Sequence, residues 1–195
     1  DAYYNLSNVY EMQGNYNYSF EANLQAVTHN TKNIKAYVQL GNKMMARGRN
    51  EDALTHLESG RTLAPNDAEL GICYSTCLIR LGRYHEAKDC LNRLLKHNPN
   101  NSDIYTNLGH ALMTEGNSSE AILALEKAIS LNKNNAKSHF NLSQIKKYTT
   151  TDPHLQLMES LHESSNLNHN DRCLLSFALG KAFGDVGDLQ KEFLL

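Results

Sequence analysis

The chain has 195 residues, of which 41% are hydrophobic and 21% are charged, as is usual for a folded protein. Its formal net charge of −2 does not provide the basic surface that nucleic-acid binding requires, and no apolar run approaches the roughly 20 residues that cross a bilayer. We therefore expect neither nucleic acid nor a membrane as a partner. No secretory signal is visible and the four cysteines lack paired CxxC spacing, so we expect free thiols and a cytoplasmic location.

Five kinds of position recur every 34 residues along the chain. The glycine column marks places where a helix ends with positive φ, and the Asn/Asp column provides a side chain that caps the next helix. Two columns of small residues allow paired helices to approach closely. The columns are Gly14, Gly48, Gly82 and Gly116; Asn33, Asp67, Asn101 and Asn135; Ser7, Gly41, Ser75, Gly109 and Ser143; Ser19, Ala53, Ala87 and Ala121; and Leu6, Leu40, Tyr74, Leu108 and Leu142.

These signals predict antiparallel helix pairs joined by tight turns. In chain order the predicted pairs are 2–13 with 16–29, 34–47 with 50–63, 68–81 with 84–97, and 102–115 with 118–131, followed by a single helix over 136–148. Pro65 and Pro99 follow the second helices of their pairs and prevent their continuation.

The 34-residue pattern breaks after residue 148. Thr150 stands where the next glycine would fall, and Asp152-Pro153 indicates a new helix with an aspartate N-cap and a proline in its first turn. We predict helices over 153–165 and 171–184. Residues 149–195 are interpreted as a divergent fifth repeat and part of a sixth, in a chain that we expect to be a fragment of a longer protein.

The 34-residue helix pair resembles the tetratricopeptide repeat. The family's motif stands here as Tyr37-x2-Leu40-Gly41-x2-Met44 with Ala53, and as Tyr105-x2-Leu108-Gly109-x2-Leu112 with Ala121. The resemblance covers residues 1–148, with four full hairpins and the first helix of a fifth. It implies an all-α, right-handed superhelical solenoid whose first helices line a concave groove. The RNA-reading pentatricopeptide repeat, with a period of about 35 and a basic groove, does not fit.

The resemblance also implies which residues of the first helices face the groove. One of these positions recurs as Asn5, Gln39, Cys73, Asn107 and Asn141, and a carboxamide pairs with both the N–H and the C=O of a peptide. The stripe resembles the asparagine ladder of O-linked N-acetylglucosamine transferase; the alternative is an ordinary solvated helix face. The predicted groove residues are Tyr4, Asn5, Asn8, Val38, Gln39, Asn42, Ile72, Thr76, Thr106, Asn107, His110, Phe140, Asn141 and Gln144.

A second resemblance concerns the end of the chain. Residues 152–189, including Phe177-Ala178-Leu179-Gly180 and Gly187-Asp188-Leu189, are similar to the segment that joins repeats to the catalytic domain in bacterial tetratricopeptide–sulfotransferase proteins. This similarity implies a neighbouring enzyme domain outside this chain. A different family option, the clamp for acidic chaperone tails, does not fit because Tyr4 and Cys73 stand where it needs a lysine and an arginine.

The sequence therefore predicts a protein–protein interaction module that binds an extended peptide or partner segment in its groove. The alternative is a substrate-recruiting repeat arm of a larger sulfotransferase or glycosyltransferase. End-to-end self-association is a third possibility, because the cut ends of a repeat stack are apolar. We expect no catalytic residue, no cofactor and no metal site, since no phosphate-binding loop, HExxH motif or catalytic triad spacing occurs.

Overall fold

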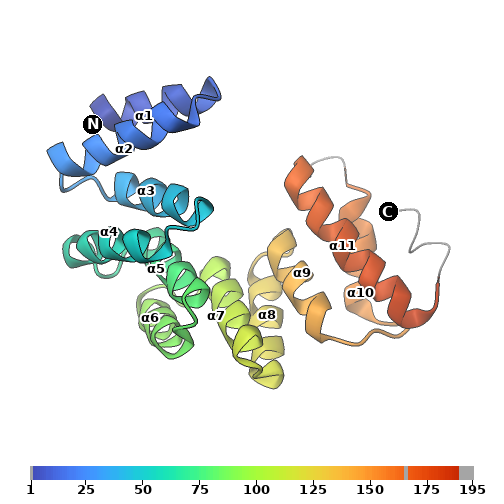
Figure 1. The fold of residues 1–195 in the computed structure, drawn as a ribbon. Helices are drawn as coiled ribbons and strands as arrows, with labels where there is room; N and C mark the ends of the chain where they lie inside the picture. Colours follow the sequence, from blue (N-terminus) through green and yellow to red (C-terminus); the bar gives the residue numbers. More distant parts are fainter. Residues whose placement is uncertain (1, 165–166, 189–195) are drawn as a thin grey trace. The chain divides into compact units, whose positions relative to one another are not determined.

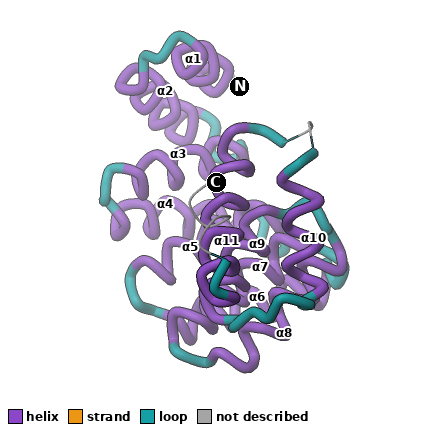
Figure 2. Tube along the Cα trace, turned by 90° about the vertical axis from the view of Figure 1, so that its right-hand side faces the viewer, coloured by secondary structure: helices purple, strands orange, loops and turns teal. Residues whose placement is uncertain are grey.

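The computed structural model describes residues 2–164 and 167–188, and within these ranges it contains eleven α-helices and no strand (Figures 1 and 2). The chain divides into two compact units, residues 1–99 and 100–195, which are described separately. The predicted all-α class and the pairing of helices are confirmed. No helix of the described part is both long and apolar enough to cross a membrane.

The first unit contains three helix pairs. Each pair packs on the next, and the first helix of the second pair also contacts the first helix of the third. The pairs are α1 (Ala2–Met12) with α2 (Tyr16–His29), α3 (Ile34–Ala46) with α4 (Asn50–Leu63), and α5 (Ala68–Arg80) with α6 (Tyr84–His97).

The second unit begins with one further regular pair and ends with three helices in a different arrangement. Its helices are α7 (Ser102–Glu115), α8 (Ser118–Leu131), α9 (Ala136–Ile145), α10 (Pro153–His162) and α11 (His169–Val186). The long helix α11 packs on both α9 and α10. The division of the chain at residue 148 into regular and divergent repeats stays a prediction.

The predicted helix signals act as expected. Asn33 Oδ1 accepts a hydrogen bond from the Ala36 N–H at 3.1 Å, and Asp67 Oδ1 accepts one from the Leu70 N–H at 2.8 Å. Asn101, Asn135 and Asp152 cap their helices in the same way. The four predicted turn glycines have φ values between 73° and 93°, a region that favours glycine.

The columns of small residues are explained by close helix packing. A Cβ added to Gly41 would lie 2.7 Å from Leu57 Cδ2, and one added to Gly109 would lie 2.5 Å from Leu125 Cγ. Both leucines are fully buried. In these two pairs the second helix therefore inserts a leucine where the first helix has no side chain.

The prediction that α9 extends to residue 148 is wrong, because this helix ends at Ile145. Lys181 Nζ on α11 donates a hydrogen bond to the Lys146 carbonyl, and Asp185 Oδ2 accepts one from the Tyr148 N–H at 3.1 Å. Lys146 has extended backbone geometry, with ψ 140°. Side chains of α11 thus hold the backbone that would otherwise continue α9.

Candidate functional site

The predicted groove residues of the first unit lie on α1, α3 and α5. Val38 is buried, Asn5 and Asn42 are exposed, and Tyr4, Asn8, Gln39, Ile72 and Thr76 are half-buried. Whether these positions contact a ligand stays a prediction, but their neighbours are now defined.

Polar side chains of successive first helices contact one another in this unit. Gln39 Nε2 donates a hydrogen bond to Asn8 Oδ1 at 2.7 Å, and Cys73 Sγ donates one to Asn42 Oδ1 at 3.3 Å. Both pairs are separated by 31 residues, three fewer than the repeat length. Part of the hydrogen-bonding capacity of the predicted stripe is therefore used within the protein. The 31-residue offset between two polar columns is the sequence signal that identifies these pairs.

A cavity of about 360 Å³ opens beside Asn42. It lies where the end of α1 and the start of α2 meet α3, and five of its residues were not predicted from the sequence. The cavity is lined by Glu11, Tyr16, Asn42, Lys43, Ala46 and Arg47. Tyr16 is 64% exposed, so its ring is accessible to a partner, and a space of this size accommodates a large apolar side chain.

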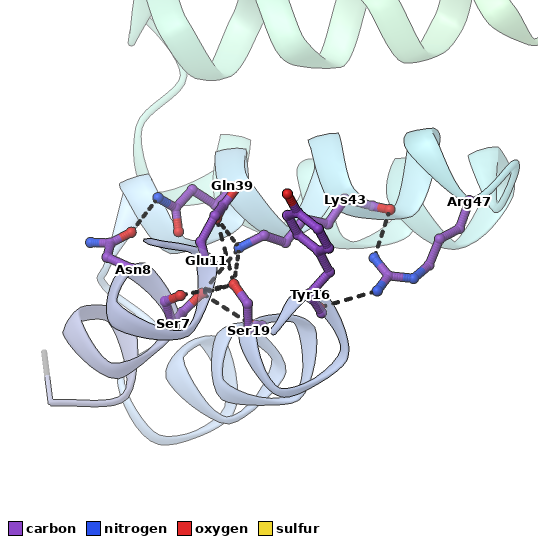
Figure 3. Close-up of polar contacts among 8 residues, drawn as sticks. All are labelled: Ser7, Asn8, Glu11, Tyr16, Ser19, Gln39, Lys43 and Arg47. Atoms are coloured by element: carbon purple, nitrogen blue, oxygen red, sulfur yellow. Dashed lines mark hydrogen bonds and ion pairs between the residues drawn. The ribbon is translucent and has the colours of Figure 1, made fainter. Parts of the chain in front are cut away.

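Lys43 organises one wall of the cavity (Figure 3). Its ammonium lies 2.8 Å from Glu11 Oε2, 2.7 Å from Ser19 Oγ and 3.1 Å from Ser7 Oγ. These three contacts use all three N–H donors of a lysine. Lys43 therefore joins α1, α2 and α3, and its charge is already compensated by Glu11.

Arg47 also lines the cavity and is the C-cap residue of α3 (Figure 3). Its guanidinium carbon lies 4.5 Å from the centroid of the Phe20 ring, and its Nη2 donates to the Tyr16 carbonyl at 3.2 Å. The remaining contacts are with the Lys43 carbonyl and the Asn17 amide oxygen. None of these partners is a carboxylate, so within residues 2–164 and 167–188 Arg47 is a positive charge at the cavity without an ion-pair partner.

In the second unit the predicted groove residues are less exposed. Thr106, Asn107 and Asn141 are buried, His110 and Phe140 are half-buried, and Gln144 is exposed. Asn107 Nδ2 donates to the Asp103 carbonyl of its own helix at 2.8 Å. Asn141 Nδ2 is buried without a hydrogen-bond partner among the described residues. His110 is another of the predicted groove residues, and its burial and the charge of Lys137 lower its pKa.

Comparisons with protein families agree with this architecture. Residues 44–108 match a family model described as tetratricopeptide repeat, and residues 78–139 match a second model with the same description. The chain therefore contains tetratricopeptide repeats over residues 44–139. A search of curated proteins found no match.

Several solved structures share the fold. TTC0263, a tetratricopeptide repeat protein of Thermus thermophilus, has a TM-score of 0.74 and 16% identity over 91% of this chain and 97% of its own. PilW, described as a type IV pilus biogenesis factor, has a TM-score of 0.75 and 17% identity over 99% of this chain and 88% of its own. A structure of MamA from residue 41 to its end, from Desulfovibrio magneticus RS-1, has a TM-score of 0.64 and 20% identity over 85% of this chain and 96% of its own. Identities this low establish the fold alone.

The comparisons do not support the expected association with a sulfotransferase. The matched family models cover residues 44–139, whereas the similarity to the sulfotransferase-linked segment lay in residues 152–189. Within residues 152–188, the structure shows α10 and α11 packed together next to α9.

Proposed function

We propose that the chain binds a segment of a partner protein, with an apolar side chain of the partner inserted into the cavity between α1, α2 and α3. The observation that supports this proposal is the position of the cavity beside Asn42, on the helix surface that the family resemblance predicts to face the groove. The exposed Tyr16 ring and the methyl group of Ala46 provide apolar contact, and Arg47 attracts an acidic residue of the same segment.

The expected energetics require several contacts. Burying one leucine-sized side chain contributes about 1.5–3 kcal/mol, and each neutral hydrogen bond adds about 1 kcal/mol. The cavity alone therefore supports only weak binding. In the second unit, the unpartnered Asn141 amide donor is suited to a peptide carbonyl, so we propose that the carboxamides of that unit bind a peptide backbone independently of the cavity.

The cavity is tested with a displayed library of random 12-residue peptides selected on the full chain, followed by calorimetry with the best peptide. Ala46→Glu fills the cavity and neutralises Arg47, and we expect at least a tenfold loss of affinity. Gln25→Glu is the matched control, because it changes the net charge by the same −1 at an exposed position of α2 outside the cavity. Equal affinity for wild type and Ala46→Glu would contradict the cavity as the binding site.

The carboxamide stripe is tested separately with the double substitution Asn107→Ala and Asn141→Ala. We expect weaker binding of those selected peptides whose affinity Ala46→Glu leaves unchanged, together with an unchanged helical signal in circular dichroism. An unchanged affinity would remove the stripe from the proposal and leave the cavity.

A second candidate is self-association through α1. Leu6 is 40% exposed, whereas Leu40 at the same repeat position is 0% exposed because neighbouring helices cover it. Tyr3 and Val9 extend this apolar surface along α1. Light scattering over a concentration series tests the idea, with Leu6→Lys expected to shift the chain toward monomer. A monomer at every concentration argues against it.

A further inference from the structure

Two histidines and a tyrosine form a buried hydrogen-bonded cluster in the second unit. His139 lies on α9, Tyr148 lies in the connector 146–152, and His154 lies in the first turn of α10; their exposed fractions are 0%, 2% and 9%. His139 Nδ1 is 2.7 Å from His154 Nε2, and His154 Nδ1 is 2.8 Å from the Tyr148 hydroxyl. His139 Nε2 is 2.7 Å from the Lys133 carbonyl. The cluster thus joins three segments that follow the regular repeats.

The hydrogen bonds determine where the protons are. A carbonyl only accepts, so His139 Nε2 carries the proton that it donates to Lys133. His139 Nδ1 then accepts from His154 Nε2–H, and His154 Nδ1 accepts from the Tyr148 hydroxyl. In this arrangement both imidazoles are neutral and every ring nitrogen has a partner.

Among the described residues, the acids that lie near the cluster are already paired and do not balance an added proton. In the connector, Asp152 is bound by Lys146 at 3.0 Å and also caps α10 through the His154 N–H. On α11, Asp185 is bound by Lys181 at 2.6 Å. The two lysine nitrogens lie 5.5 and 5.3 Å from the Tyr148 ring centroid, so positive charge already surrounds the site.

Both histidines therefore resist protonation in the folded unit. Burial lowers the pKa of His139, and the hydrogen bond to the Lys133 carbonyl opposes this only in part. Burial first, and then the charges of His139 and Lys146, lower the pKa of His154 to about 3. Protonation of both imidazoles would also place the His139 Nδ1–H and the His154 Nε2–H face to face across 2.7 Å.

We propose that the His139–Tyr148–His154 cluster is an acid-sensitive latch that holds α10 and the connector 146–152 on α9. When the latch opens, the histidines return to their ordinary pKa of about 6.5 and take up protons that the closed state excludes. Because the closed-state pKa is lowered, stability is complete above about pH 6.5 and falls as the pH drops below that value. Below this pH, each histidine lowers the equilibrium constant for closing the latch by about tenfold for each unit that the pH falls.

Opening of the latch exposes apolar surface. Leu155 and Met158 on α10 are buried in one cluster with Leu175 and Leu179 of α11. Release of α10 uncovers these side chains, so acidification would present a new apolar surface in the second unit. This inference is independent of the cavity proposed as the partner site, which lies in the first unit.

Hydrogen exchange of the full chain at pH 7, 6 and 5 tests the latch, with rates corrected for the intrinsic effect of pH. We expect protection of amides 146–162 to fall at least tenfold between pH 6 and 5, while α7 and α8 keep theirs. Protection of 146–162 that does not change with pH, or that falls equally in α7 and α8, overturns the proposal.

A substitution separates titration from packing. His154→Gln keeps a donor and an acceptor but does not ionise, so it should reduce the loss of protection between pH 6 and 5 by about tenfold. His169→Gln, at an exposed position on α11, should leave the wild-type pH dependence intact. Unchanged pH dependence in His154→Gln contradicts the latch. If that variant does not fold, NMR titration of the nine wild-type histidines decides, since a titration of all nine near pH 6.5 excludes the latch.

Discussion

The ammonium of Lys43 on α3 lies 2.7 Å from the Ser19 hydroxyl oxygen on α2, which places a polar junction between the first two helix pairs. At the same repeat positions, later pairs have Cys77 and Ala111 in place of the lysine, and alanine in place of the serine. The first pair is thus attached by hydrogen bonds at a place where the later repeats carry small side chains.

Replacing Lys43 by methionine should destabilise the attachment of α1 and α2. Ser7 and Ser19 remain hydrogen-bonded to each other's carbonyls, so the loss is limited to the contacts of the ammonium. We expect a decrease of about 1–2 kcal/mol in the free energy of unfolding, measured with urea. Lys35→Met on the exposed side of α3 is the control, with a change within about 0.5 kcal/mol. Equal stability of the two variants would show that the junction contributes nothing.

Asn23→Leu should stabilise the first helix pair. Asn23 is 0% exposed, and neither of its side-chain polar atoms has a hydrogen-bond partner in the described part of the chain. The same position in the later pairs holds Leu57, Leu91 and Leu125, all 0% exposed.

The third pair shows that a leucine fits at this position. Leu91 packs there although Ser75 stands at the position that Ser7 takes in the first pair. Because the substitution removes a buried amide without hydrogen-bond partners, we expect the free energy of unfolding to increase by about 1–3 kcal/mol, seen as a higher melting temperature. Gln25→Leu, at an exposed position of the same helix, should give no comparable gain. A lower melting temperature for Asn23→Leu would refute the prediction.

Two glycines of the second unit should respond in opposite ways to alanine. At Gly109 the new Cβ would lie 2.5 Å from Leu125 Cγ, whereas at Gly180 no atom lies within 4 Å of it. Gly109→Ala should therefore destabilise the unit by about 1–3 kcal/mol through overpacking. Gly180→Ala should stabilise it by about 0.5–1 kcal/mol, because alanine is favoured in a helix interior. Thermal unfolding of both variants provides the comparison, and a shift of the same sign in both would contradict the packing argument.

Most of the fold was predictable because each helix end carries its own local signal. Asn33, Asp67, Asn101 and Asn135 cap helices within three residues of themselves, and the turn glycines need positive φ whatever surrounds them. Such requirements depend on neighbouring residues in the chain, so they repeat with the 34-residue period and can be read without coordinates.

The candidate site and the latch depend on contacts between different repeats. The sequence by itself determined the class and the helix pairs, and its resemblance to the family predicted a groove position for Asn42. Only the tertiary structure decided that Lys43 contacts Ser19 and that His139 lies next to His154. It also decided that α9 ends early, where Lys181 and Asp185 bind the backbone after it. The physical reason is that these contacts are set by how helices of different repeats pack and by side-chain conformation, which no local pattern of residues records.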